Sequence, residues 1–195
     1  MGRMKERMLR GELYLADDPE LAEDHARAQM LLDRYNATAH TDDRERTRLL
    51  SELLGAVGDG VVIKPPLRCD YGRYISIGDG TFVNYGAIML DVAPITIGAA
   101  CQIATGVQLL TATHPIDPSA RRVGWESGAP ITLEDNVWLG GGVIVCPGVT
   151  VGADTVVGAG AVVTRDLPPG VVALGNPARV HREITAEDTD DVPDR

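Results

Sequence analysis

A six-residue repeat constrains the fold of this chain more than any other feature of its sequence. Apolar residues recur at every sixth position in one long run, Leu133, Leu139, Val145, Val151, Val157 and Val163. Four positions after each of them stands a further apolar or small residue, Val137, Val143, Val149, Thr155, Ala161 and Leu167. Two shorter runs with the same spacing lie upstream, Ile77, Val83 and Met89 and then Ile97, Ile103 and Leu109.

This period matches neither the α-helix, at about 3.6 residues, nor the alternation of a strand. It suits a solenoid in which each short strand ends in a sharp corner. The apolar residue points inward, and a glycine such as Gly140, Gly152 or Gly158 turns the corner. Each coil then hides its interior by stacking on its neighbours. The alternative, a β-sandwich with accidental spacing, does not explain so many successive matches, so the repeat predicts a mainly β, parallel solenoid.

The repeat is interrupted in two places. Met89 and Ile97 are separated by eight residues rather than six, across "DVAP". Residues 111–130 do not follow the pattern, although Leu109 and Leu133 are 24 residues apart, a multiple of six. We therefore expect a loop over 111–130 that leaves the solenoid and returns in register. It begins with "TATHPIDP", which contains His114.

Both ends of the chain differ from the repeats in composition. Residues 1–56 read as helical, with one helix from Pro19, capped by Asp18, to Asn36, and a second from about Thr41. The repeats then define a solenoid domain over 57–184. Residues 185–195 are acidic and low in hydrophobicity, which predicts a disordered tail.

Charge and composition exclude several classes of protein. A net charge of −10 argues against a broad basic surface for nucleic acid. No apolar run reaches the length of a membrane span, and the N-terminus lacks the apolar segment of a signal peptide. The three cysteines form no CxxC pair. We expect a cytoplasmic protein with reduced thiols and no nucleic-acid or membrane partner.

Motifs around the repeats resemble one family of enzymes. They read "GELYLADDPEL", "CDYG", "FVNYGAIMLDV", "TATHPID", "DNVWLGGGVIVCPGVTVG", "VVGAGAVVTRDLPP" and "GNPARV". Over about residues 5–184 they are similar to the maltose and galactoside O-acetyltransferases, which include nodulation acetyltransferases, and most similar to the maltose branch. The resemblance implies a left-handed parallel β-helix and a homotrimer with active sites between subunits. It also implies transfer of acetyl from acetyl-CoA to a sugar hydroxyl, with no metal required.

The chemistry of this transfer requires a base. A sugar hydroxyl is a poor nucleophile unless its proton is removed as it attacks, and histidine titrates in the range that suits this task. The resemblance implies that His114 is this general base. Glu126 lies 12 residues further on and is our second catalytic candidate, as the group that holds the histidine tautomer. The N–H of Gly140 or Gly141 is a candidate donor to the tetrahedral oxyanion.

The resemblance also implies the residues that bind the two substrates. Asp18 is ambiguous, because it is equally a good helix cap, and Trp138 can either wall the cleft or pack. Galactoside-type relatives carry an arginine where this chain has His25, which argues against galactoside specificity; we expect no role for His25 itself. The acceptor candidates are Asp18, Asp70, Asn84, Asp91 and Trp138. The acetyl-CoA candidates are Gly141, Ala159, Thr164, Arg165, Arg179 and Arg182.

Three other interpretations are compatible with a solenoid. A carbonic anhydrase of this fold needs three zinc-binding histidines, and residues 60–180 contain only His114. A non-enzymatic scaffold leaves the histidine loop and the terminal arginines unexplained. An acyltransferase acting on an antibiotic or an amino sugar remains open.

Overall fold

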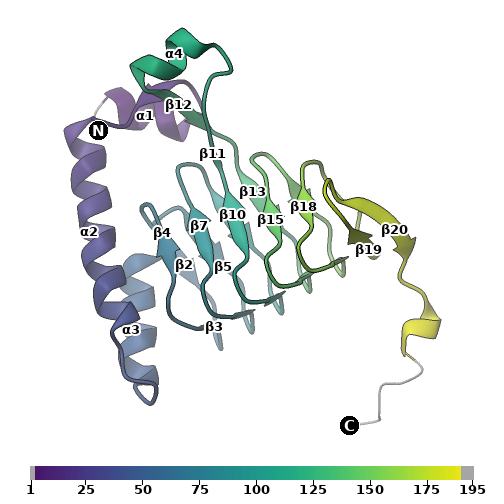
Figure 1. Cartoon of the computed structure of the whole chain (residues 1–195). Helices are drawn as coiled ribbons and strands as arrows, with labels where there is room; N and C mark the ends of the chain where they lie inside the picture. The colour runs from purple at the N-terminus through teal and green to yellow at the C-terminus, as the bar shows by residue number, and fades with distance from the viewer. Residues whose placement is uncertain (1–2, 190–195) are drawn as a thin grey trace.

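The structure is a computed structural model and describes residues 3–189. Short strands wind into a parallel β-helix of about six turns. Helices cover the end of this solenoid where the chain enters it, and a β-hairpin closes the other end (Figure 1). A loop carrying a short helix projects from the middle of the solenoid and lies beside the N-terminal segment.

Three helices precede the solenoid, α1 (Arg3–Leu9), α2 (Pro19–Asn36) and α3 (Asp43–Leu53). The predicted cap of α2 is confirmed, because the Asp18 carboxylate accepts the N–H of Glu20 at 3.0 Å. The third helix begins two residues after the predicted Thr41, since Asp42 caps it. Helix α1 did not stand out as a separate element in the sequence.

Polar side chains of α2 fasten the helices to the first coil. Tyr35 is fully buried, and its Oη donates to the carbonyl of Ile63 at 2.5 Å. Asn36 accepts the N–H of Leu67 and donates to the carbonyl of the same residue. Apolar residues of α2 and α3 continue the solenoid core, so the helices cover the open end that a first coil leaves exposed.

Three parallel sheets form the walls of the solenoid. The first contains β2 (Ala56–Val57), β5 (Ile75–Ile77), β8 (Ile95–Ile97), β13 (Ile131–Leu133) and β16 (Thr150–Val151). The second contains β4 (Arg68–Cys69), β7 (Ile88–Leu90), β10 (Gln108–Leu110), β15 (Ile144–Val145) and β18 (Val162–Val163). The third contains β3 (Val62–Ile63), β6 (Phe82–Val83), β9 (Gln102–Ile103), β14 (Trp138–Leu139), β17 (Val156–Val157) and β19 (Val171–Leu174), followed by antiparallel β20 (Arg179–Glu183).

The six-residue repeat builds the core as predicted. Every apolar residue that defines the three runs is at most 3% exposed. In the long run from Leu133 to Val163, the residues four positions later are buried as well, including the one hydroxyl among them, Thr155, whose Oγ1 donates to the carbonyl of Pro168 at 2.8 Å. The core therefore consists of two stacked inward positions per hexapeptide.

Strand register shows how the loop is accommodated. Val145 pairs with Val163, 18 residues further on, so one late coil has 18 residues. Leu109 pairs with Val145, 36 residues further on, although the two strands are direct neighbours. The loop therefore adds the length of one coil between neighbouring strands, and the repeat resumes in register, as its position in the sequence predicted.

The loop has more regular structure than the sequence indicated. It contains β11 (Ala112–Thr113), α4 (Pro118–Val123) and β12 (Trp125–Gly128). The N-terminal segment adds a third strand, β1 (Tyr14–Leu15), so that β1, β12 and β11 form one antiparallel sheet. The guanidinium of Arg7 also lies 5.6 Å from the ring centroid of Trp125. Residues near the N-terminus thus hold the loop in place (Figure 1).

The first residues of the predicted acidic tail, up to Thr189, lie within the described part of the chain, and the predicted disorder of the tail stays a prediction. Residues Ala186–Thr189 form a 3-10 helix, η1, and the Asp188 carboxylate accepts two hydrogen bonds from the Arg182 guanidinium, at 2.6 and 2.8 Å. Residues 190–195 of the predicted tail lie outside the described part of the chain. Across residues 3–189, no helix has the length and apolar character needed to cross a membrane.

Candidate active site

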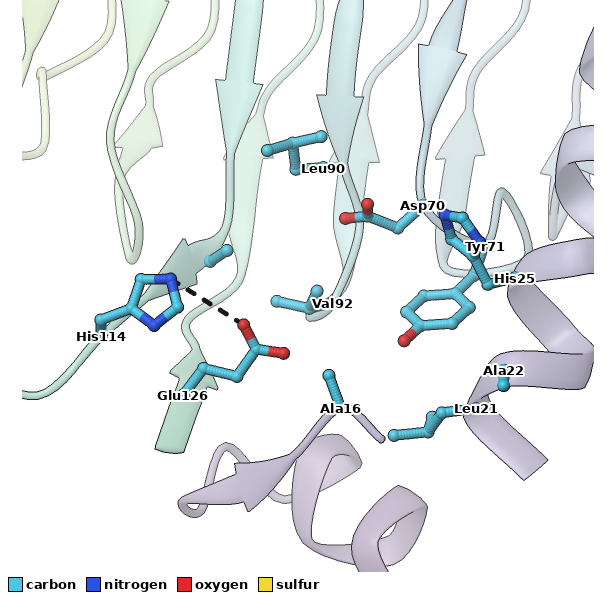
Figure 2. A pocket seen from close by; sticks show the side chains of 11 residues that line it. Ala16, Leu21, Ala22, His25, Asp70, Tyr71, Leu90, Val92, His114 and Glu126 are labelled. Carbon is cyan, nitrogen blue, oxygen red and sulfur yellow. Dashed lines mark ion pairs between the residues drawn. The ribbon is translucent and has the colours of Figure 1, made fainter. Parts of the chain in front are cut away.

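The loop, the second sheet and helix α2 enclose a pocket of about 480 Å³. His114 and Glu126 enter it from the loop, Asp70 from the end of β4, and His25 from α2 (Figure 2). The structure therefore brings together both catalytic candidates and one acceptor candidate, Asp70. Asp70 and Glu126 are 56 positions apart in the sequence, and His25 and Glu126 are 101 positions apart.

His114 stands at the edge of the pocket with its ring about half exposed (55%). Its Nε2 lies 4.0 Å from Oε2 of Glu126, whose side chain is 17% exposed. Its Nδ1 lies 3.4 Å from the carbonyl oxygen of Trp125. Because a carbonyl can only accept, this contact favours a proton on Nδ1 and a lone pair on Nε2. The structure thus places Trp125, rather than Glu126, where the tautomer is held, and it places Glu126 beside the basic nitrogen.

Asp70 and His25 form the opposite wall of the pocket (Figure 2). Burial raises the pKa of the Asp70 carboxyl, His25 opposes the rise, and Glu126 adds to it. The His25 ring packs edge-on against Tyr71, with centroids 6.3 Å apart. The sequence predicted no role for His25 and did not place it at this pocket. The signal that could have found it is the replacement of the arginine of galactoside-type relatives.

Asp91 is buried behind the pocket wall and is not among the residues that line the pocket of His114. Its side chain is fully buried, and its Oδ1 accepts the backbone N–H groups of Asp70 and Tyr71 at 3.0 and 2.8 Å. Its Oδ2 accepts the N–H of Tyr74 at 3.3 Å. Burial raises the pKa of this carboxyl to about 6. Asp91 therefore holds the turn that carries Asp70 and Tyr71 into the pocket, which differs from the direct acceptor contact that the resemblance implied.

The other acceptor candidates lie elsewhere in the chain. Asp18 caps α2 and does not line the pocket of His114. Asn84 and Trp138 line a separate hollow on the third sheet, where the Trp138 ring is 53% exposed. Within one chain, the structure does not bring Asn84 and Trp138 to His114.

The acetyl-CoA candidates follow the later coils. The N–H of Gly140 donates to the carbonyl of Val157 at 2.8 Å, which leaves Gly141 as the candidate oxyanion donor of the two glycines. Gly141 and Ala159 lie on neighbouring coils, because the N–H of Gly160 donates to the Gly141 carbonyl at 2.9 Å. Three other candidates are exposed near the end of the solenoid, Thr164, Arg165 and Arg179. Arg182 lies on the terminal hairpin and is bound by Asp188.

Comparison with known proteins identifies the family. The maltose acetyltransferase hexapeptide capping motif matches residues 7–58, and the bacterial transferase hexapeptide matches residues 130–165. Nodulation protein L of Rhizobium meliloti is 49% identical over 176 residues, which cover 90% of this chain and 96% of that protein. The crystal structure of a maltose O-acetyltransferase from Clostridium difficile 630 is 44% identical and superposes with a TM-score of 0.92, over 93% of this chain and 97% of that one. The chain belongs to the maltose and galactoside O-acetyltransferase family.

A third match concerns the co-substrate of these acetyltransferases. A galactoside acetyltransferase in complex with coenzyme A is 35% identical and superposes with a TM-score of 0.93, over 97% of this chain and 94% of that one. The left-handed hexapeptide β-helix and the use of acetyl-CoA are thereby confirmed for this O-acetyltransferase. Within residues 3–189, no group of three or more His, Cys, Asp or Glu side chains is placed to hold a metal ion.

Proposed function

We propose that this acetyltransferase acetylates a hydroxyl of a maltose- or glucose-type glycoside by direct attack on acetyl-CoA, with His114 as the general base. The observation that carries the proposal is the Nε2 atom of His114, which faces the pocket that also contains Asp70 and His25, while the Trp125 carbonyl lies at Nδ1. A lone pair on Nε2 can accept the proton of an attacking hydroxyl. Such a base contributes about 10²- to 10⁴-fold to the rate.

The steps follow from this arrangement. The acceptor oxygen forms a bond to the thioester carbonyl carbon as its proton moves to Nε2 of His114. The tetrahedral oxyanion that results accepts a hydrogen bond from the N–H of Gly141. The intermediate then collapses, the carbon–sulfur bond breaks, and the imidazolium returns the proton to the CoA thiolate. The carboxylate of Glu126, 4.0 Å from Nε2, stabilises the imidazolium between these two steps.

Polar groups in the pocket support a sugar as the acceptor. Asp70 and His25 face the space beside His114, and a carboxylate and an imidazole can each bind more than one hydroxyl. His25 replaces the arginine of galactoside-type relatives, which favours a glucose-type glycoside over a galactoside. An antibiotic or an amino sugar is the alternative acceptor, and it would place a cation or an amine near Asp70.

We also propose a homotrimer in which two chains complete each site. Asn84 and Trp138 lie apart from His114 within one chain, and the Trp138 ring is exposed. The loop presents two further exposed apolar side chains, Ile116 (95%) and Val123 (64%), which a neighbouring chain would cover. Thr164, Arg165, Arg179 and Arg182 would bind the acetyl-CoA phosphates, with the pantetheine arm along Gly141 and Ala159. A solution mass of one chain would contradict this assembly.

The test of the proposed base is thiol release from acetyl-CoA with a panel of glucosides, galactosides, maltose and amino sugars. For His114→Ala we expect kcat with the preferred sugar to fall by about 10²- to 10⁴-fold. The matched control is His40→Ala, an exposed histidine between α2 and α3, which should keep wild-type turnover. Sugar-dependent release that survives in His114→Ala would reject the base. Preferential release with an amino sugar would instead favour the alternative acceptor.

A further inference from the structure

Tyr14, in the "GELY" motif, belongs to a row of side chains that ends at His114. Strand β1 pairs with β12 so that Tyr14 lies opposite Glu126. Strand β11 pairs with β12 so that Thr113 lies opposite Ser127, and one further step in this register places His114 opposite Glu126. The 4.0 Å contact between His114 and Glu126 agrees with that register. Since directly opposed residues of antiparallel strands share one face, all three side chains lie on the same face of this small sheet.

The three side chains differ in burial along the row. Tyr14 is fully buried, Glu126 is 17% exposed and His114 is 55% exposed. Tyr14 packs with Leu21, Tyr71 and Val92, which line the pocket itself. Within the described part of the chain its hydroxyl makes no hydrogen bond of ordinary geometry, although the Glu126 carboxylate lies close enough to raise the pKa of the phenol. A buried hydroxyl without a partner is costly, and such groups often serve a function.

We propose that Tyr14 is a positioning residue, whose hydroxyl donates a hydrogen bond to the Glu126 carboxylate in the reacting complex and so fixes the carboxylate that faces His114. This inference rests on the proposed function. Hydrogen bonds in catalytic sets are often long before the substrate binds and shorten in the reacting complex. Burial raises the pKa of the Tyr14 phenol above its ordinary value, and the Glu126 carboxylate raises it further. The phenol therefore keeps its proton at neutral pH and acts only as a donor.

The hydrogen bond would have a consequence for the basicity of His114. A carboxylate that shares its charge with a phenol attracts the imidazolium less strongly than a carboxylate that does not. Loss of the hydroxyl should therefore strengthen the attraction between the Glu126 carboxylate and the imidazolium, and loss of the Glu126 charge should remove that attraction. The other titratable groups at this pocket, His25 and Asp70, are present in every variant, and loss of the Glu126 charge also removes one of the effects that raise the pKa of Asp70.

The experiment measures kcat and the pH profile of kcat/KM for the preferred sugar in Tyr14→Phe, Glu126→Gln and the double variant. We expect Tyr14→Phe to lower kcat by about tenfold, with little change in KM for acetyl-CoA. It should also move the acidic limb of the kcat/KM profile, where activity rises with pH, to higher pH. Glu126→Gln should move that limb to lower pH. In the Glu126→Gln background, Tyr14→Phe should have no further effect on either kcat or the limb.

A matched control is Tyr35→Phe, which removes another fully buried hydroxyl, one that donates to the Ile63 carbonyl between α2 and the first coil. It should lower the thermal midpoint but leave the acidic limb in place. An unchanged limb in Tyr14→Phe, or an equal effect with and without Glu126, would overturn the inference. If His114→Ala is inactive while Tyr14→Phe keeps the wild-type kcat and pH profile, only the role of Tyr14 is rejected. If His114→Ala keeps its activity, the proposed base is rejected, and the inference that rests on it is rejected as well.

Discussion

The buried carboxyl of Asp91 should make the stability of this protein depend on pH in a predictable direction. Burial raises its pKa to about 6, from an ordinary value of 3.8, against the opposing effect of the backbone N–H groups that it accepts. Protonated Asp91 therefore stabilises the folded state. This contribution is fully present below about pH 3.8 and is lost as the pH rises through about 6, where the buried carboxyl ionises. At about 1.36 kcal/mol per pKa unit, the loss amounts to about 3 kcal/mol.

The variant Asp91→Asn isolates this effect, because the amide is nearly isosteric and neutral at every pH. The measurement is urea unfolding followed by tryptophan fluorescence at pH 4, 5, 6 and 7, at one fixed protein concentration. We expect the free energy of unfolding of the wild type, minus that of the variant, to fall by about 2.4 kcal/mol between pH 4 and pH 7, because part of the full change has already occurred at pH 4. Subtracting the variant removes from the comparison the titration of acids that do not interact with Asp91; Asp70, which adds to the pKa rise of Asp91, stays coupled to it.

A second variant tests whether burial is the cause. Asp79 is exposed and also accepts a backbone N–H of a neighbouring coil, that of Asp59, at 2.8 Å. The difference between the wild type and Asp79→Asn should change much less with pH. A difference for Asp91→Asn that stays constant, or that grows as the pH rises, would refute the reasoning, since the N–H groups would then outweigh burial. Because Asp91 holds the turn of Asp70 and Tyr71, the variant should also raise KM for the sugar more than KM for acetyl-CoA.

Two further predictions concern the solenoid and its end. A Cβ at Gly140 would lie 2.6 Å from the backbone nitrogen of Ala159, whereas one at Gly141 would lie 3.5 Å from the Thr105 carbonyl. Thermal unfolding should therefore show Gly140→Ala destabilised by about 1–3 kcal/mol and Gly141→Ala nearly unchanged, and equal midpoints would contradict the close stacking of these coils. In kinetic assays, Asp188→Asn should free Arg182 and lower KM for acetyl-CoA by about two- to fivefold, with no such change for an acetyl donor that lacks the 3′-phosphate. An equal change in KM for both donors would contradict binding of the 3′-phosphate by Arg182.

The sequence predicted the solenoid well because its period is a direct consequence of the structure. Each coil repeats the same inward positions, so the apolar residues at every sixth position from Leu133 onward can be recognised as buried from their spacing alone. The location of the loop followed from the same period, as the place where the period fails. The pairing of β1 with β12 could not be predicted in this way. It joins two-residue stretches more than a hundred positions apart, and such short strands leave no periodic signal.

Individual site residues were harder to place than the fold. The resemblance identified Asp91 as an acceptor contact, but a sequence motif does not distinguish a carboxylate that binds a ligand from one that binds backbone N–H groups. The position of His25 at the pocket was also not predicted, because a histidine on a helix reads as a surface residue until the helix is packed against the pocket. Burial and contact across the fold determine where both residues lie, and neither is encoded in local spacing.

The position of His114 follows from what a hexapeptide solenoid can and cannot provide. Its corners require small residues, since a Cβ at Gly140 already meets the next coil, so the coils supply backbone groups more readily than a long, oriented base. A base must therefore come from an excursion, and β11 and β12 alone would form a two-stranded hairpin, which is marginally stable in water. Strand β1 adds the third strand that such a sheet needs. The N-terminal segment thus supports the loop that carries His114 and Glu126, in addition to covering the end of the solenoid.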